Sequence, residues 1–184
     1  MYSNGYAVED FYNKYPFPQR NESYIRTKSI QLKDLFHKLG IIDTLPHKPL
    51  ILDAGCGTGT YTNSIALAFP EAKVIGINVS QRSIEYAETQ AKNMKLSNVE
   101  YFVADIFDLP KNVSLAYYDL VWCSGALHHT HSVKEGIKIL SSLGKPNSYF
   151  ILSLYHVGRW KTFLQRFFRK ALRSMLTKAK QQII

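Results

Sequence analysis

Three glycines at alternate positions stand directly behind an aspartate in the stretch Leu50–Thr62, LILDAGCGTGTYT. Glycine has no Cβ atom, so glycines at this density allow a ligand to approach the backbone closely. Dinucleotides, nucleoside triphosphates and sulfonium cofactors all bind at glycine-rich turns of this kind. The residues around the glycines decide among these three ligand classes.

The phosphate-binding motifs do not fit this stretch. The dinucleotide fingerprint G-x-G-x-x-G fails because Thr60 or Thr62 occupies the third glycine position, depending on the frame. The triphosphate motif needs G-K-[ST], and residues 50–67 contain no lysine. Asp53 would also place a negative charge beside a pyrophosphate, which favours a bare helix N-terminus. A ligand that carries an ammonium and a sulfonium would instead be stabilised by Asp53.

A second group of residues with possible chemistry is the histidine cluster of ALHHTH, which contains His128, His129 and His131. Histidine titrates in the range that suits a general base, and His128 and His129 are the candidates for that role. The alternative is that this loop only shapes a pocket. We expect no metal site, because no carboxylate or cysteine stands at ligand spacing and adjacent side chains point apart.

Strand and helix patterns alternate along the chain from Leu50 onward and must position these residues. Apolar runs predict strands, and amphipathic runs predict helices between them. Ser80 is the expected cap of one helix, and Ser132 with Glu135 forms the capping box of another. The alternation indicates an α/β fold with a mostly parallel, doubly wound sheet that binds ligands at the carboxyl ends of its strands. The predicted strands are residues 50–54, 73–79, 99–104, 118–124 and 148–155, and the predicted helices are 23–39, 60–69, 81–96 and 132–145.

The run DAGCGTG between a strand and a helix resembles motif I of class I S-adenosylmethionine-dependent methyltransferases. The similarity spans about residues 50–155 and includes VIGINVS, FVADIFDLP and YDLVWCSGALHHT, the last of which is similar to the methyltransferase type 11 subgroup. The stretch DFYNKYPFP is similar to leader segments in some bacterial members. The resemblance implies a Rossmann-like sheet in a three-layer αβα arrangement, and methyl transfer from S-adenosylmethionine.

The resemblance also implies roles for particular residues. Gly55, Gly57 and Gly59 would lie against the methionine part of the cofactor, with Asp53 near its ammonium. Asp105 would accept a hydrogen bond from the exocyclic amine of the adenine, and the Ile106 backbone N–H would contact the ring. The other implied cofactor contacts are Cys56, Asn78, Val79, Ser124 and Gly125.

Asn78 departs from the family pattern, which has an acid at this position to grip both ribose hydroxyls. An amide offers one acceptor oxygen and carries no charge, so we expect weaker cofactor binding. This departure supports an alternative hypothesis, a non-catalytic cofactor-binding or partner-activating pseudo-methyltransferase. The methyl acceptor is expected to be a small molecule, although family members also modify lipids, quinones, proteins and RNA.

The net charge of +9 is concentrated near the C-terminus, where residues 158–180 carry eight of the basic side chains. Apolar residues recur there at helical spacing, which predicts a basic amphipathic helix over residues 158–184. A core-facing helix, a lid over the substrate, and contact with a membrane surface or nucleic acid all fit this pattern.

The chain is expected to have three parts: an irregular segment over residues 1–22, a methyltransferase domain over 23–157, and the C-terminal helix. The prolines of YNKYPFPQRN favour the irregular segment. The start of the sequence has no secretory signal pattern, and its longest apolar run is too short to span a bilayer. Both observations predict a soluble cytoplasmic protein. Cys56 and Cys123 give no disulfide framework and are expected to be small buried thiols.

In the family, two further strands follow the fifth and close that side of the sheet. We expect this sequence to lack both of them, which would leave SYFILSLY as an exposed apolar edge strand. A partner strand, a second copy of the chain or a downstream segment would then cover it, so self-association is a further expectation.

Overall fold

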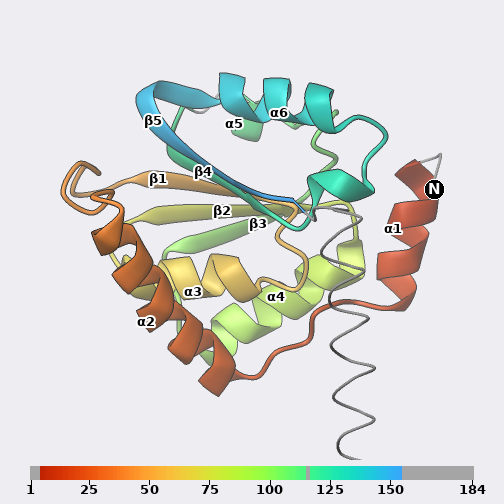
Figure 1. The fold of residues 1–184 in the computed structure, drawn as a ribbon. Helices are drawn as coiled ribbons and strands as arrows, with labels where there is room; N and C mark the ends of the chain where they lie inside the picture. Colours follow the sequence, from red (N-terminus) through yellow and green to blue (C-terminus); the bar gives the residue numbers. More distant parts are fainter. Residues whose placement is uncertain (1–4, 115–116, 155–184) are drawn as a thin grey trace, which may run out of the picture. The chain divides into compact units, whose positions relative to one another are not determined.

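Five parallel strands form one sheet in the computed structural model, which describes residues 5–114 and 117–154 (Figure 1). The order across the sheet is β3-β2-β1-β4-β5, and each neighbouring pair is parallel. This confirms the predicted α/β class. The strands are β1 (Leu50–Ala54), β2 (Lys73–Asn78), β3 (Val99–Val103), β4 (Tyr118–Ser124) and β5 (Gly144–Ser153).

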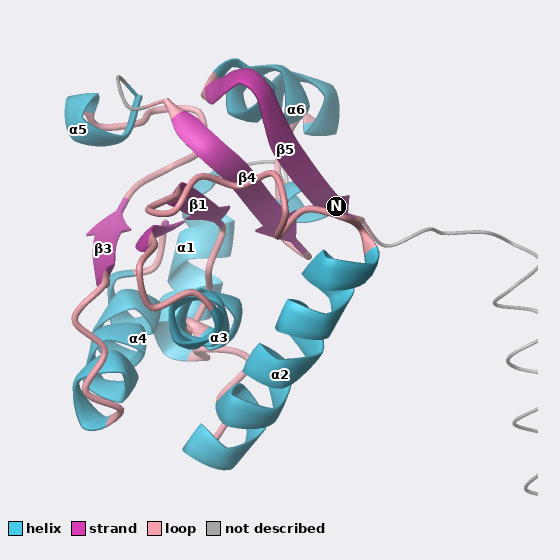
Figure 2. Cartoon of the chain, turned by 90° about the vertical axis from the view of Figure 1, so that its left-hand side faces the viewer, coloured by secondary structure: helices cyan, strands magenta, loops and turns pink. Residues whose placement is uncertain are grey.

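Helices cover both faces of this sheet, so the architecture has three layers (Figures 1 and 2). One face carries α2 (Glu22–Lys38), α3 (Thr60–Ala68) and α4 (Gln81–Asn93), and the other carries α5 (Lys111–Ser114) and α6 (Val133–Ser142). A short 3-10 helix, η1 (Leu127–His129), connects β4 to α6. Side chains alternate between the two faces of each strand, which explains why the core has two parts.

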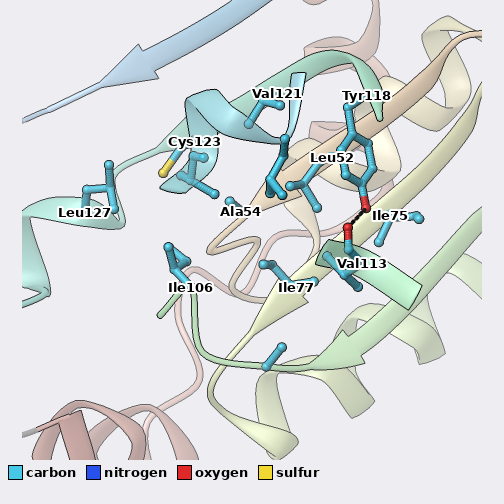
Figure 3. Close-up of a cluster of buried hydrophobic side chains, with 13 residues drawn as sticks. Leu52, Ala54, Ile75, Ile77, Ile106, Val113, Tyr118, Val121, Cys123 and Leu127 are labelled. Atoms are coloured by element: carbon cyan, nitrogen blue, oxygen red, sulfur yellow. Dashed lines mark hydrogen bonds between the residues drawn. The ribbon is translucent and has the colours of Figure 1, made fainter. Parts of the chain in front are cut away.

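The two parts of the core use neighbouring residues of the same strands. On the side of α2 and α3, Ile51 of β1 packs with Phe36 and Ile65. On the other side, Leu52 packs in a cluster that includes Cys123 and Leu127 (Figure 3). Strands β1, β2 and β4 are buried on both faces, and each corresponds to a continuous apolar run of the sequence, whereas the edge strands β3 and β5 are partly exposed.

Two helix starts match the capping residues expected from the sequence. The Ser80 hydroxyl accepts a hydrogen bond from Ser83 N at 3.1 Å, and the Ser132 hydroxyl accepts one from Glu135 N at 3.2 Å. The Glu135 carboxylate lies 3.7 Å from His131 Nε2. Both caps satisfy backbone N–H groups that the first helical turn leaves without a partner.

The N-terminal segment differs from the prediction of irregular structure over residues 1–22. Helix α1 (Gly5–Lys14) occupies much of it, and α1 belongs to the same compact unit as the sheet. The prediction was wrong here because Pro16 and Pro18 come after this helix and stop it without interrupting it. Asn21 then caps α2 by accepting from Tyr24 N at 2.9 Å.

The predicted amphipathic helix over residues 158–184 lies outside the described residues. Within the described part of the sheet, β3 and β5 are the two edge strands. Self-association through β5 stays a prediction. None of the described helices is long and apolar enough to cross a membrane.

Asp119 links three strands at the end of the sheet opposite the glycine turn. Its Oδ2 atom accepts from Leu50 N at 2.8 Å, and its Oδ1 atom pairs with Lys145 Nζ at 2.7 Å. The residue is only 8 % exposed. We expect Asp119→Ala to lower the free energy of unfolding by about 2–3 kcal/mol, because the Leu50 N–H loses its partner in a buried position.

Urea unfolding measures this loss, and Lys145→Ala is the matched control. That variant keeps the bond to Leu50 and removes a half-exposed charge, so it should cost about 1 kcal/mol or less. Equal losses in the two variants would show that the ion pair, and not the buried N–H, makes the larger contribution.

Candidate functional site

The glycine turn that connects β1 to α3 lies at the carboxyl ends of the strands. Gly55 and Gly59 both have φ +77°, in the left-handed region that favours glycine. A Cβ atom on Gly55 would lie 2.2 Å from Ala126 Cβ, and one on Gly59 would lie 2.6 Å from the Tyr101 hydroxyl. These two glycines are therefore required by contacts within the protein itself. The backbone N–H groups of Gly55 and Cys56 both donate to Ile77 O at 2.9 Å, which holds the turn against β2.

Gly57 differs from the other two glycines of the turn. It also has a positive φ, +55°, but a Cβ atom there would lie 3.1 Å from the carbonyl oxygen of Phe17. The Thr58 hydroxyl beside it donates to the Pro18 carbonyl. The middle of the turn therefore faces the segment that follows α1.

Asp53 ends up buried behind the glycine turn, with 2 % of its surface exposed. The Thr62 hydroxyl donates to its Oδ2 atom at 2.6 Å. Burial raises the pKa of the Asp53 carboxyl from 3.8 to about 7, and the hydrogen bond from Thr62 opposes part of that rise. An approaching cation would favour the ionised carboxylate, so this group is suited to a positively charged ligand.

Asn78 lies at the end of β2, as the sequence predicts. Its Oδ1 atom accepts from Ser80 N at 2.9 Å, and its backbone carbonyl accepts from Ala104 N at 3.0 Å. Val79 stands between Asn78 and the cap of α4. The amide oxygen is thus already used in a local turn, and the side-chain nitrogen can only donate.

Asp105 and Ile106 follow β3 at the same edge of the sheet. Asp105 is exposed, and its Oδ1 atom accepts from Phe107 N at 3.0 Å. Ile106 is buried at 7 % exposure in the core cluster beside Leu127 (Figure 3). The Asp105 carboxylate is therefore exposed to solvent, while the buried side chain of Ile106 holds the backbone of this segment against the core.

The residues that follow β4 complete this edge. Gly125 has φ +75°, and no atom lies within 4 Å of the position that its Cβ would take. Its N–H donates to Ser153 O at 3.0 Å, which ties the loop to β5. Ser124 is the last residue of β4 and is partly buried. Open space beside Gly125 leaves room for a ligand at the end of β4.

The histidines lie in and just after η1. The rings of His128 and His129 are 4.1 Å apart, and burial, followed by the neighbouring His129, lowers the pKa of His128. His131 packs against Phe107 at 4.1 Å instead. Across the described residues, no three side chains of His, Cys, Asp or Glu gather as a metal site would require. Cys56 and Cys123 are both free and buried, as expected.

The structure brings the predicted cofactor residues of β1, β2, β3 and β4 to one edge of the sheet. Sequence reasoning missed the contribution of the N-terminal segment to this edge. Asn13 Oδ1 accepts from the Ser80 hydroxyl at 2.9 Å and from Arg82 N at 3.3 Å, which holds α1 on the start of α4. The available signal was the stretch DFYNKYPFP, which is similar to leader segments in some bacterial members.

Known proteins match the chain in sequence and fold. It is 29% identical over 117 residues to an uncharacterised protein of Synechococcus, covering 61% of this chain and 27% of that protein. It is 38% identical over 58 residues to a tRNA (guanine-N(7)-)-methyltransferase of Rubrobacter xylanophilus, covering 32% and 26%. The chain thus spans about a quarter of the length of these two relatives.

Among solved structures, the magnesium protoporphyrin IX methyltransferase of Synechocystis, bound to SAH, superposes with a TM-score of 0.64 at 25% identity. The match covers 89% of this chain and 78% of that one. A family model described as a methyltransferase domain matches residues 48–182, which include the glycine turn and all five strands. The chain belongs to this methyltransferase domain family.

Proposed function

We propose that this chain binds S-adenosylmethionine at the carboxyl edge of its sheet and transfers the methyl group to a small-molecule acceptor. The observation that carries the proposal is the buried Asp53 carboxyl directly behind the glycine turn, where β1 has neighbours on both sides. Ligands of doubly wound sheets bind at this point, where the strand order reverses. A carboxyl whose pKa is raised by burial supports an ammonium-bearing ligand more than a phosphate.

The residues present fit such a cofactor from one end to the other. The methionine part would lie along the turn and the open space at Gly125, with Asp53 behind its ammonium. The ribose would lie at Asn78 and Val79, and the adenine between Asp105 and Ile106. The full proposed set is Asp53, Gly55, Cys56, Gly57, Gly59, Asn78, Val79, Asp105, Ile106, Ser124 and Gly125.

The cofactor supplies an electrophilic methyl group that is already activated by its sulfonium. A lone pair of the acceptor forms a bond to the methyl carbon while the carbon–sulfur bond breaks, and its electron pair stays on sulfur. The chain has to align the acceptor and exclude water. A hydroxyl or amine acceptor also loses a proton, and we propose His128 and His129 as its acceptors, since burial lowers the pKa of His128 and so favours the neutral ring that can take up a proton.

The alternative is a chain that binds cofactor without turning it over. The bond between Asn78 and Ser80 N favours this alternative, because it uses one of the two lone pairs on the only acceptor oxygen of the side chain. Turnover of methyl-labelled S-adenosylmethionine against a metabolite pool separates the two functions.

RNA is a second acceptor class, supported by the similarity to the tRNA methyltransferase. A cytoplasmic location is part of the proposal and rests on the two free cysteines.

Calorimetric titration with S-adenosylmethionine and with SAH tests the proposal directly. We expect both to bind and Gly57→Val to abolish binding, because the new side chain fills the space between the turn and Phe17 O. Gly40→Val is the matched control: it has the same kind of backbone strain at φ +66°, but nothing lies within 4 Å. Heat of binding with NAD and none with S-adenosylmethionine would overturn the proposal.

Asn78→Asp should tighten SAH binding by about 1 kcal/mol, or about fivefold. One carboxylate oxygen can keep the bond to Ser80 N while the other accepts a charge-assisted bond from a ribose hydroxyl. Asn93→Asp adds the same charge at the exposed far end of α4 and should leave the affinity unchanged. Weaker binding by Asn78→Asp would mean that the ribose lies elsewhere.

The affinity for SAH should rise about tenfold between pH 6 and pH 8 and level off above that range. The free protein ionises Asp53 with a pKa of about 7, and the ligand ammonium favours the ionised form, so protonation competes with binding below that pH. Asp53→Asn should bind weakly at every pH in this range. Asp43→Asn, an exposed control, should keep the full pH dependence.

Ligand-free stability gives an independent check of the same carboxyl. The unfolded chain keeps the ordinary pKa near 3.8, so the folded protein binds more protons between about pH 4 and pH 7. Its free energy of unfolding should therefore fall as the pH rises through that window. Asp53→Asn should remove the contribution of Asp53 to this fall, and an unchanged slope would mean that Asp53 is ionised throughout.

A further inference from the structure

A series of aromatic rings runs from α1 to η1 at the carboxyl edge of the sheet. Phe11 lies 5.5 Å from Tyr15 and 5.4 Å from Tyr12, measured between ring centroids. Tyr12 lies 6.3 Å from the ring of His129, which lies 4.1 Å from His128. The rings of two elements far apart in sequence thus form one continuous series, which we call the aromatic series.

The outer members of the aromatic series are exposed. Phe11 and Tyr15 are 47 % and 56 % exposed, and Phe17, two residues after Tyr15 in the sequence, is 63 % exposed. The hydrophobic cores are built from other residues, so these rings are not needed to complete them. Large apolar rings that gather at one place on a surface commonly mark a ligand-binding or partner-binding site.

Hydrogen bonds fix the helix that carries these rings. Asn13, on the same helix, accepts from the Ser80 hydroxyl and from Arg82 N. The chain after the helix passes Gly57, whose missing Cβ would point at Phe17 O. The α1 end of the aromatic series is therefore fixed close to the proposed cofactor turn, and its other end is the histidine pair.

We propose that the aromatic series is one wall of the acceptor site and that the acceptor is a flat aromatic small molecule. This inference rests on the proposed methyl transfer. Aromatic side chains stack on flat rings with a gain beyond the buried area alone. An acceptor stacked on Phe11 and Tyr15 would direct one edge past Tyr12 toward the histidine pair, where a hydroxyl or amine can lose its proton.

The charges around the aromatic series favour a small molecule over a nucleobase within RNA. Glu9 and Asp10 stand two positions and one position before Phe11 on the same helix, and Lys14 lies 5.5 Å from the ring of Tyr15. RNA binding depends mainly on basic side chains that contact phosphates. Two acids against one lysine on α1 do not provide such a surface.

Ligand-observed saturation-transfer NMR on the SAH-saturated chain tests the inference. The probes are catechol, 1-naphthol and isoquinoline, each paired with a non-aromatic counterpart: cyclohexane-1,2-diol, decahydro-1-naphthol and decahydroisoquinoline. We expect saturation transfer to the aromatic probes and none to the saturated compounds. Phe11→Leu/Tyr15→Leu, which keeps apolar surface but removes the rings, should weaken binding of the aromatic probes at least tenfold.

The same variant should bind SAH like the original chain, because neither side chain belongs to the proposed cofactor set. Tyr117→Ala is the matched control, since Tyr117 is 65 % exposed and precedes β4 at the opposite end of the sheet. It should leave binding of both SAH and the aromatic probes unchanged. Correct folding of each variant is read from its SAH titration.

Each remaining result has a separate meaning. SAH binding without binding of any aromatic probe would show that the inference is wrong while the cofactor proposal stands. No SAH binding by the original chain would overturn the cofactor proposal itself. Loss of RNA binding, or conversion of a dimer to a monomer, in Phe11→Leu/Tyr15→Leu with probe binding unchanged would assign the rings to a macromolecular interface and overturn the inference.

Discussion

The structure depends on the close approach of three other segments to the glycine turn after β1. Gly55 lies against the loop after β4, and Gly59 lies against β3 and α4, each at a distance that excludes a side chain. The turn therefore sets the spacing of the elements around it as much as it provides space for a ligand. Tyr101 has a central part in this packing, because its ring also lies against Gly76 of β2. A Cβ atom on Gly76 would lie 2.7 Å from carbon atoms of that ring. The hydroxyl of Tyr101 then donates to Asn63 Oδ1 at 2.7 Å, which ties the edge strand β3 to α3.

The start of α4 is the second point where separate parts of the chain meet. The Ser80 hydroxyl caps its own helix and donates to Asn13 of α1, and the Ser80 N–H donates to the side-chain oxygen of Asn78. One serine thus links the end of β2, the helix that follows it and the N-terminal helix. The same residue places α1 next to the proposed ribose position. Any movement of α1 has to break or replace the bonds at Asn13.

Much of this arrangement was predictable from the sequence because it follows from local patterns. The buried strands have continuous apolar runs, and the helix starts carry serine caps. The glycine run lacks the residues that the dinucleotide and triphosphate motifs require, which leaves a sulfonium cofactor. The order of the strands was not predicted, because the alternation of strands and helices does not determine which strands are neighbours. The site residues at the ends of β1, β2, β3 and β4 all reach one edge, as a parallel sheet requires.

Long-range contacts account for what the sequence did not predict. The helix over Gly5–Lys14 was missed because the two prolines after it dominated the interpretation of the segment. The packing roles of Gly55 and Gly59 depend on Ala126 and Tyr101, which are more than 40 residues away in the chain. The use of the Asn78 oxygen by Ser80 N depends on the backbone path after β2. None of these contacts leaves a periodic pattern in the sequence.

The strand order also determines how the chain can fold. Strands β1, β2 and β3 with α3 and α4 come from one continuous stretch, so their contacts close short loops and can form early. Strand β4 has to join β1 at the centre of the sheet, where Ile51 pairs with Leu120, nearly 70 residues later. Parallel pairing over such a separation is slow because the loop entropy is lost before the contacts form. A sheet without β4 would leave the edge of β1 open, and an open strand edge with apolar side chains favours aggregation.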